Sequence, residues 1–232
     1  MVQGGDATVF AGLGADRELL GRTSTAERVA AILRERITDG SLAPATRLAE
    51  DVIGQALGVS RNTLREAFRL LAHERLLVHE LNRGVFVRKL TAQDVSDLYR
   101  VRRLVECAAV RTATAPDEAH LKALRGALDD ATSAAEEHRW LDVGTANIHF
   151  HHALTALAGS PRVDELMRQI FAELRLAFSV MADPQAFHEP YLARNRRIVE
   201  LLEAGRTGDA ERELAAYLDD AEQQLLARLA ES

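Results

Sequence analysis

The most constraining feature of this 232-residue sequence is the string LGVSRNTLREAFRLL at positions 57–71. Gly58 is suited to the left-handed backbone that ends a helix. Ser60 can cap a second helix, because its hydroxyl can accept a hydrogen bond from a free backbone N–H group. Apolar residues recur at helical spacing along that second helix, at Leu64, Phe68 and Leu71. The string therefore predicts two short helices joined by a tight turn, with the second helix buried along one side.

Three arginines lie on the opposite side of this second helix. Arg61, Arg65 and Arg69 are four residues apart, so they share one helical face. A guanidinium group can bind a phosphate or a guanine edge through two hydrogen bonds, and the first turn of a recognition helix is where bases are read. A solvated arginine face on an ordinary surface helix is the alternative. We favour DNA contacts from the start of the helix, made by Ser60, Arg61, Asn62, Thr63 and Arg65.

The flanking segments complete a small domain around these two helices. Residues 25–40 show apolar residues every four positions and end in glycine, which predicts a preceding helix. The segments LLVHE (76–80) and VFVRK (85–89) predict two short strands joined by the turn LNRG. A helix, a helix-turn-helix and a hairpin in this order are typical of a winged helix-turn-helix domain.

The turn between the two strands places an arginine at the tip of the wing. The positive φ angles of a tight hairpin turn explain Asn82 and Gly84 but not Arg83. An arginine at this position can reach the adjacent minor groove, where narrow A·T-rich DNA concentrates negative potential. Arg83 is therefore a further candidate for DNA contact.

The sequence after Thr91 predicts only helices. The expected helices cover residues 94–114, 117–138, 141–158, 161–181, 190–205 and 207–230. They are separated by breaks at Gly159 to Pro161, at Pro184, at Pro190 and at Gly205 to Gly208. Helices of these lengths pack most simply as an antiparallel bundle.

These patterns divide the chain into three parts. Residues 1–24 contain several glycines without periodicity and predict a mobile tail, residues 25–90 predict the winged helix-turn-helix, and residues 91–232 predict the bundle. The expected fold class is mostly α: an N-terminal winged helix-turn-helix with a small β-hairpin wing, followed by an all-α antiparallel helical bundle.

Charge separates the two folded parts. Residues 25–90 carry eleven Lys or Arg and eight Asp or Glu, whereas the whole chain has a net charge of −6. Only the smaller, basic part is therefore expected to meet a polyanion.

The composition also excludes several classes of protein. The single cysteine, Cys107, excludes an internal disulfide framework and a cysteine-rich zinc finger. No run approaches 18 uninterrupted apolar residues, so we expect no membrane span. The first residues lack the basic and apolar regions of a secretory signal. We therefore expect a cytoplasmic protein.

Specific motifs in both parts resemble a known family. The run I-x-x-G-x-L-x-P-x-x-x-L from Ile37, the string LGVSR-x-x-L-R-E-A from Leu57 and RGVFV from Arg83 resemble the DNA-binding domain of GntR-type bacterial transcription regulators. The stretches DLYRVRRLVE (97–106) and N-x-x-F-H-x-A-L (147–154) resemble the C-terminal ligand-binding FCD bundle of the FadR subfamily. This resemblance implies a homodimeric regulator, most often a repressor, that binds a double-stranded DNA operator and responds to a small-molecule effector in the bundle. It also implies that Ser60 flanks the DNA contacts of Arg61 and that Gly84 joins Arg83 at the wing.

The DNA-binding motif departs from the family at two places. Many relatives carry Thr-Pro where this chain has Asn62 and Thr63, so we expect the inner bases of the operator to differ from the common family sequence. Some relatives place a DNA-contacting arginine in the first helix of the motif, where this chain has Asp51. That contact is not expected here.

The resemblance also identifies the effector pocket and argues against a metal. Family members hold a divalent metal with an Asp or Asn and three histidines, and these positions align with Asn147, His151, Asn195 and Tyr217. Only His151 is a strong ligand, because amide and phenol oxygens bind transition metals poorly compared with imidazole. We therefore expect no metal and no cofactor.

An arginine predicts the kind of effector. Arg102 matches a family arginine that faces the pocket and can hold a carboxylate; Arg103 takes this place if the register is shifted by one. With Asn147, His151, Asn195 and Tyr217, Arg102 predicts a site for a small organic acid or a similar polar metabolite. The alternative is that these are interior polar groups that satisfy one another or bind water.

Two other functions compete with transcription regulation. The cluster of His149, His151 and His152 allows a metal-dependent hydrolytic enzyme, but no H-E-x-x-H motif, nucleophile elbow or glycine-rich phosphate loop supports one. A non-specific DNA-binding protein is the second alternative, and the modest positive charge of residues 25–90 disfavours it. We therefore expect a regulator and no enzyme.

Overall fold

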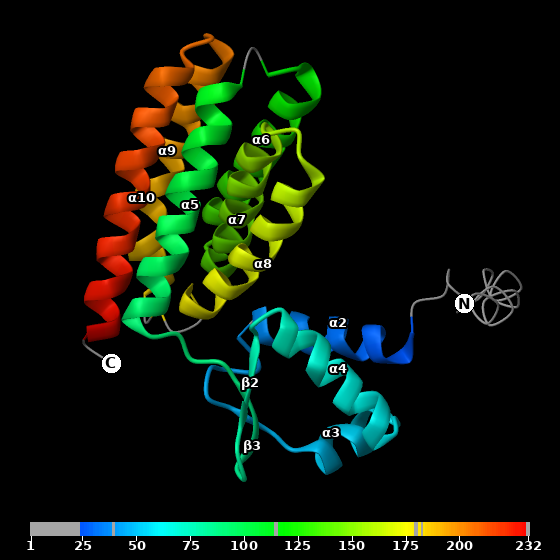
Figure 1. The fold of residues 1–232 in the computed structure, drawn as a ribbon. Coiled ribbons are helices and arrows are strands. Elements are labelled where there is room, and N and C mark those ends of the chain that lie inside the picture. Colours follow the sequence, from blue (N-terminus) through cyan, green and yellow to red (C-terminus); the bar gives the residue numbers. More distant parts are fainter. Residues whose placement is uncertain (1–23, 39, 114–115, 179–180, 182, 231–232) are drawn as a thin grey trace, which may run out of the picture.

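The computed structural model describes residues 24–38, 40–113, 116–178, 181 and 183–230. The tail predicted at residues 1–24 lies, except for Ser24, outside the described residues. Figure 1 shows two parts: a small domain, which we call the head (residues 25–90), lies beneath a helical bundle (from residue 91). The structure is mostly helical with a small antiparallel sheet, as the sequence predicts.

The head contains three helices and three short strands. Gly58 ends the first helix of the motif with φ of 65°, and its N–H bonds to carbonyl oxygens of that helix. The apolar stripe of the second helix is completely buried, with Leu64, Phe68 and Leu71 all at 0% exposure. In chain order the elements are α2 (Thr25–Thr38), β1 (Arg47–Leu48), α3 (Glu50–Leu57), α4 (Arg61–His73), β2 (Leu77–Glu80) and β3 (Gly84–Val87).

Strand β1 was not expected from the sequence. It pairs with β3, so that the sheet order is β1-β3-β2, with Arg47 opposite Phe86 and Leu48 opposite Val85. Two residues are too short to show the alternation by which strands are recognised. The buried Leu48 anchors this strand in the head core.

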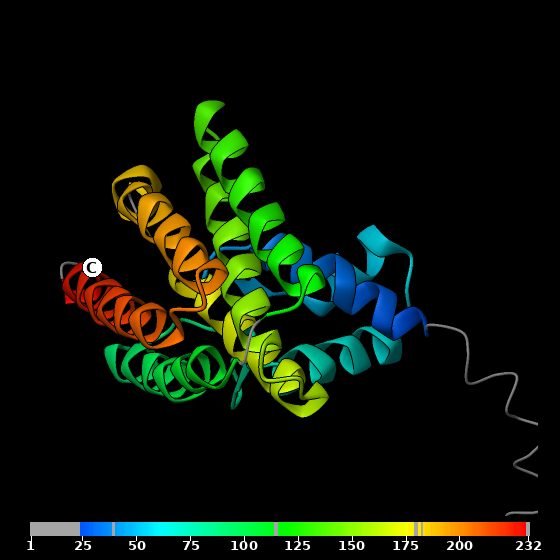
Figure 2. The ribbon, with the colours of Figure 1, turned by 90° about the horizontal axis from the view of Figure 1, so that it is seen from above.

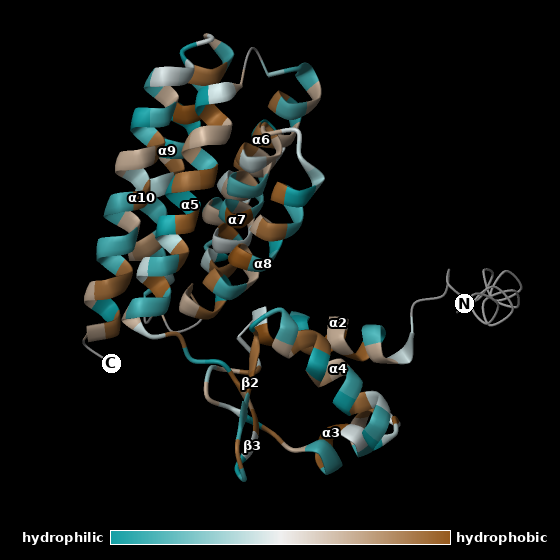
Figure 3. Ribbon diagram, viewed as in Figure 1, coloured by the Kyte–Doolittle hydropathy of each residue, from teal (hydrophilic) through white to brown (hydrophobic). Residues whose placement is uncertain are grey.

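The bundle consists of six helices in the described part of the chain. Seen from above, α5 and α10 lie side by side (Figure 2), and α6 packs mainly against α7. Figure 3 shows both hydrophilic and apolar residues along the helices at the front of the bundle, such as α5 and α10, as expected when one side of a helix faces a core. No described helix is both long and apolar enough to cross a membrane. The helices are α5 (Ala92–Thr112), α6 (Glu118–Glu136), α7 (Trp140–Ala156), α8 (Pro161–Phe178), α9 (Pro184–Glu203) and α10 (Thr207–Ala230).

One predicted helix break is wrong. Pro190 lies inside α9, which begins six residues earlier at Pro184. A proline inside a helix removes a hydrogen bond at a cost of about 3 kcal/mol. Phe187 and Tyr191 are buried on either side of it, with ring centroids 5.8 Å apart, and burying one such side chain stabilises by about 2–3 kcal/mol. The packing of this face therefore outweighs the local effect of the proline.

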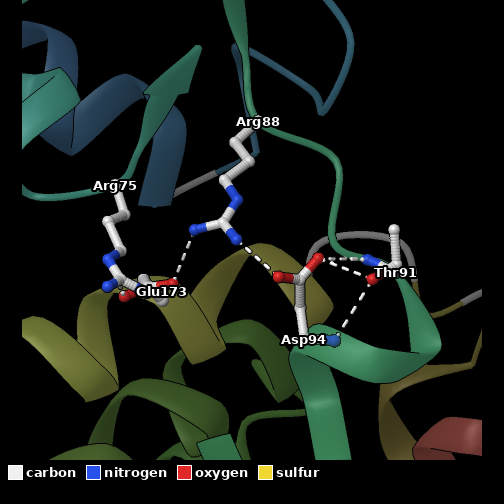
Figure 4. Close-up of polar contacts among 5 residues, drawn as sticks. All are labelled: Arg75, Arg88, Thr91, Asp94 and Glu173. Carbon is white, nitrogen blue, oxygen red and sulfur yellow. Dashed lines mark hydrogen bonds and ion pairs between the residues drawn. The ribbon is translucent and has the colours of Figure 1, made fainter. Parts of the chain in front are cut away.

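Ion pairs join the head to the bundle (Figure 4). Arg88, just after β3, contacts Glu173 of α8 at 2.8 Å and Asp94 of α5 at 2.5 Å. Arg75 of the head lies 3.8 Å from the same Glu173. Asp94 also completes a capping box with Thr91 at the start of α5. Arg88, which lies between the head and the bundle, is therefore bound by one carboxylate from α5 and one from α8.

Candidate DNA-binding and effector sites

The second helix of the motif, α4, presents its arginines to solvent. The side chains of Arg61, Arg65 and Arg69 are 69%, 58% and 74% exposed. Their face is opposite the buried stripe that fixes α4 in the head core. The helix can therefore enter a groove of DNA without any rearrangement of the core.

Two of these arginines are paired with acidic residues at the start of α3. Arg61 lies 2.7 Å from Asp51, and the Nε of Arg65 lies 3.0 Å from Glu50. Exposed ion pairs of this kind contribute about 0–1 kcal/mol. Both guanidinium groups can therefore exchange their carboxylates for phosphates or base edges at little cost.

The other candidates at the start of α4 divide into two roles. Ser60 caps the helix by accepting a hydrogen bond from the N–H of Thr63 at 3.2 Å, and the two hydroxyl oxygens lie 2.8 Å apart. Asn62, the residue between Arg61 and Thr63, is exposed. Ser60 and Thr63 therefore hold the first turn in place, whereas Asn62 remains available to a ligand.

The wing has the backbone geometry that its turn predicts. Asn82 and Gly84 adopt positive φ angles of 60° and 113°. Arg83 is 71% exposed, pairs with Glu80 and lies over the ring of Phe86 at 5.5 Å. The arginine is thus held at the tip of the wing by a neighbouring ring.

A further basic residue, Arg47, was not singled out in the sequence. It is exposed on β1, opposite Phe86 of the wing strand. A Cβ atom added at Gly84 would lie 3.4 Å from the Nε of Arg47, so the guanidinium group passes close to the wing turn. Only the unpredicted pairing of β1 with β3 brings Arg47 there.

The candidate effector residues meet in the bundle interior. Arg102 comes from α5, Asn147 and His151 from α7, Asn195 from α9 and Tyr217 from α10, and all five are buried. Arg103 instead contacts Asp219 and Glu222 at the side of α10, with 30% of its side chain exposed. The register is therefore the one in which Arg102 faces inwards.

Three of these residues form one hydrogen-bond network. The Oδ1 of Asn147 accepts a hydrogen bond from Asn195 Nδ2 at 2.6 Å and another from the Tyr217 hydroxyl at 3.1 Å. The Tyr217 ring also contacts the ring of His151, with centroids 5.0 Å apart. The structure thus brings together positions from three different helices, as expected for this site.

Glu106 completes the site and was not singled out in the sequence. Its carboxylate accepts a hydrogen bond from Arg102 Nε at 2.7 Å and lies 2.6 Å from His151 Nδ1. Arg102 and Glu106 are four residues apart, a spacing that places them on one face of a helix. This four-residue spacing could have indicated the Arg102–Glu106 ion pair from the sequence, but the same spacing also occurs in many exposed ion pairs.

Burial and charge together set the protonation states of Glu106 and His151. Burial opposes ionisation of Glu106, but Arg102 and His151 outweigh it and hold the pKa of its carboxyl below the ordinary value. Burial lowers the pKa of His151, against the attraction of Glu106. The site therefore holds one cation, one anion and a neutral imidazole, and its net charge is zero.

Three buried polar atoms of the site have no hydrogen-bond partner: Arg102 Nη2, His151 Nε2 and Asn195 Oδ1. Buried polar atoms in folded proteins are nearly always paired. Because Nδ1 of His151 faces a carboxylate, it carries the proton, and Nε2 is left as an acceptor. The site thus offers one donor and two acceptors to a polar molecule.

The donor set does not fit a divalent metal. His151 is the single imidazole, the Oδ1 of Asn147 is already engaged in two hydrogen bonds, and the guanidinium of Arg102 would repel a cation. Within the described residues, no group of three or more His, Cys, Asp or Glu side chains is placed to hold one. The chemistry of these side chains therefore favours a polar organic molecule over a metal ion.

The histidine cluster of α7 does not converge on one point. His151 is buried in the interior, whereas His149 and His152 line a separate cavity at the side of α7. This separation removes the basis on which the three residues predicted a hydrolytic site.

Comparisons with known proteins agree with the geometry of both parts. Residues 25–87 match the model of bacterial regulatory proteins of the gntR family, and residues 97–220, more than half of the chain, match the FCD domain. The chain belongs to the GntR family and carries an FCD domain. Members of this family are transcription regulators, so the enzymatic alternative is wrong.

Several relatives cover almost the whole chain. A crystal structure of a GntR regulator from Rhodococcus sp. RHA1 is 51% identical, covers 88% of this chain and 99% of that chain, and has a TM-score of 0.84. The Escherichia coli protein McbR/YncC, at 20% identity and a TM-score of 0.73, covers 90% and 99% and has the same fold. The transcriptional repressor RspR of Escherichia coli is 28% identical, over 84% of this chain and 86% of its own.

One further relative is named after a sugar-utilization operon. It is described as a probable D-xylose utilization operon transcriptional repressor of Paenarthrobacter nicotinovorans, and it is 29% identical over 86% of this chain and 89% of its own. Together these relatives establish a DNA-binding transcription regulator of the GntR family with an FCD effector-binding domain.

Proposed function

We propose that this GntR-family regulator is a homodimeric repressor whose operator binding responds to a small hydroxylated organic acid in the bundle. The observation that carries this proposal is the polar group inside the bundle, where three buried atoms have no partner. Two relatives named as repressors support the direction of regulation. A regulator of bacterial DNA acts where the chromosome is, so we place it in the cytoplasm.

The exposed face of α4 is the part that reads the operator. Its N-terminal turn enters the major groove, with Arg61, Asn62 and Arg65 facing bases or phosphates. Arg83 at the wing tip reaches the adjacent minor groove, and Gly84 lets the wing backbone come close. Arg47, beside Gly84, adds a phosphate contact. Two heads related by two-fold symmetry would bind two half-sites of a palindromic operator.

Substitution of the α4 arginines tests this interface. Arg61→Ala and Arg65→Ala should each weaken operator binding by about 5- to 150-fold, the range for losing a base contact of 1–3 kcal/mol. Arg125→Ala, at an exposed ion pair on α6, is the matched control and should leave binding unchanged. Titration at several salt concentrations separates the two kinds of contact, because losing a phosphate contact also reduces the salt dependence. If both α4 variants bound the operator as tightly as the wild type does, this face of α4 would not be the DNA-binding surface.

The three buried atoms without partners predict which polar groups the effector carries. A carboxylate oxygen can accept a hydrogen bond from Arg102 Nη2, because Glu106 engages the Nε of the same guanidinium. Hydroxyl groups can donate to His151 Nε2 and Asn195 Oδ1. An acid without hydroxyl groups would leave these two acceptors unpaired, which costs about 1–3 kcal/mol for each. The site therefore favours hydroxy acids over simple acids.

Calorimetry with a small panel of acids tests this assignment. We expect lactate or gluconate to bind more tightly than acetate or propionate. The double variant Arg102→Met/Glu106→Leu, which leaves no unpaired buried charge, should abolish the binding. Arg103→Met, which changes the neighbouring arginine on the outer side of α5, should not. Equal binding by both variants, or a preference for the simple acids, would contradict the assignment.

Helix α8 provides a physical connection from the effector site to the head. The ring of Phe171 lies 5.6 Å from the Arg102 guanidinium and 6.4 Å from the His151 ring. Two residues further along α8, Glu173 binds Arg88 and Arg75 of the head (Figure 4). An effector that moves Phe171 would shift these contacts and change the spacing of the two heads, provided that it binds one arrangement more tightly than the other.

A further inference from the structure

A cavity of about 390 Å³ lies at the side of the bundle, outside the interior site. It is bounded by α7 and α8 of the bundle and by Thr38, the last residue of α2 in the head. Its size falls within the range of small-molecule sites, about 300–1,000 Å³. Of the residues of the interior site and its neighbours, only Phe171 also lines this cavity. The cavity is therefore a separate place in the fold.

The floor of this side cavity is apolar. Ile148 of α7 and Phe171 and Ala172 of α8 line it. The ring of His152 packs against the Phe171 ring with centroids 6.3 Å apart, nearly edge to face. A flat apolar group can therefore lie against this floor with an aromatic ring beside it.

The rim of the side cavity carries basic side chains and no acidic ones among its lining residues. The basic groups are His149, His152, Arg168 and Arg175. Arg168 pairs with Glu165 on the outer side of α8, and Glu165 does not line the cavity. An apolar floor with this rim selects an anion that has an apolar body.

We propose that the side cavity binds a small apolar monocarboxylate of the benzoate type, with its ring on Ile148, Phe171 and Ala172 and its carboxylate at the basic rim. This ligand class differs from the hydroxy acid of the interior site, because the residues beneath the ring are apolar. The hydroxyl groups of Thr38 and Thr145 also line the cavity, but each already donates a hydrogen bond to a backbone carbonyl oxygen. His149 and His152, which have no part in the interior site, here become anion-binding residues.

Occupation of the side cavity has a consequence for the head. The Nε of Arg175 donates a hydrogen bond to the carbonyl oxygen of Thr38 at 2.9 Å, and its Nη2 donates to Thr145 Oγ1 at 2.5 Å. A carboxylate at the rim competes with the Thr38 carbonyl for this guanidinium. Binding therefore weakens one contact between α8 and the head. This consequence for DNA binding rests on the proposed function, whereas the binding itself does not.

Calorimetry of the full-length protein with sodium benzoate tests the site. We expect one molecule per chain, with binding at least about tenfold tighter than that of benzyl alcohol, which lacks the charge, and of acetate, which lacks the ring. The double variant His149→Gln/His152→Gln should weaken benzoate binding about tenfold, and Ala172→Phe should block it by filling the floor. The double variant Arg102→Met/Glu106→Leu, which removes the interior ion pair without leaving a buried charge, should leave benzoate binding unchanged.

A failure of the side-cavity proposal can be distinguished from a failure of the proposed function. Absence of benzoate binding, equal binding of benzyl alcohol, or loss of binding in Arg102→Met/Glu106→Leu but not in the histidine variant would each overturn the side-cavity proposal. Operator binding by the same preparations reports separately on the proposed function. If benzoate binds and no operator is recognised, the repressor assignment fails while the side cavity stands; the reverse result removes the side cavity alone.

Discussion

The head and the bundle both contain arginine–carboxylate pairs, in opposite surroundings. Arg61 and Asp51 in the head are about 70% exposed, whereas Arg102 and Glu106 in the bundle are 2% and 0% exposed. The exposed pair is screened by water, so Arg61 can exchange its carboxylate for another anion, which in the proposed function is DNA. The buried pair cannot separate without leaving a charge in an apolar interior. The same two chemical groups thus serve as a replaceable contact in one part and as a fixed scaffold in the other.

The largest expected effect comes from breaking the buried pair. Glu106→Gln leaves Arg102 buried without a counter-charge, and we expect the free energy of unfolding to fall by about 3–5 kcal/mol. Urea denaturation followed by circular dichroism measures this loss. Asp219→Asn, which removes an exposed partner of Arg103, is the control and should cost no more than about 1 kcal/mol. A double variant, Arg102→Met/Glu106→Leu, should be more stable than Glu106→Gln, and the opposite order would contradict this account.

A second prediction concerns acid and the buried His188 of α9. Burial, with Arg175 nearby, lowers the pKa of His188 from 6.5 to about 4. Between these values the unfolded chain binds a proton that the folded chain does not, so stability falls as the pH drops through this range. The expected loss is about 3 kcal/mol, since one pKa unit corresponds to about 1.4 kcal/mol.

Denaturation curves at pH 7, 5.5 and 4.5 for the wild type and His188→Gln measure this loss. The variant should lose less stability towards acid than the wild type. His79→Gln, in the exposed wing strand, should behave as the wild type does. Parallel curves for the wild type and His188→Gln would show that His188 is protonated in the folded protein.

The smallest expected effect comes from the exposed pair. Asp51→Asn releases Arg61 and removes a negative charge from the surface that we propose faces DNA. Operator affinity should rise by no more than about fivefold, corresponding to 1 kcal/mol, and the gain should shrink at high salt. Asp97→Asn, at an exposed pair with Arg100 on α5, is the matched control. A fall in affinity would show that Asp51 itself contributes to DNA binding.

The sequence predicted the head well because its signals are local. A glycine at the turn, a serine cap and a four-residue arginine spacing each act within a few residues, and the structure contains all three. The strand β1 was missed because its two residues are recognisable only through their pairing with β3. Arg47 was missed for the same reason.

The bundle interior was harder to predict because its partners are distant in the sequence. The resemblance to the FCD family indicated Arg102, Asn147 and His151, but the pattern of residues alone did not distinguish Arg102 from Arg103. Glu106 escaped notice because its role depends on His151, 45 residues away. Likewise, local rules for proline predicted a break at Pro190 that the burial of neighbouring aromatic rings overrides.

The double ion pair of Arg88 has a practical consequence for protein engineering. Because one guanidinium holds both α5 and α8, the boundary between the head and the bundle is not a simple tether that can be cut and rejoined at will. A chimeric regulator that combines this head with a foreign bundle must carry acidic residues at the positions of Asp94 and Glu173. Without them we expect the transplanted head to bind its operator but to lose the contacts through which, under the proposed function, α8 transmits effector binding.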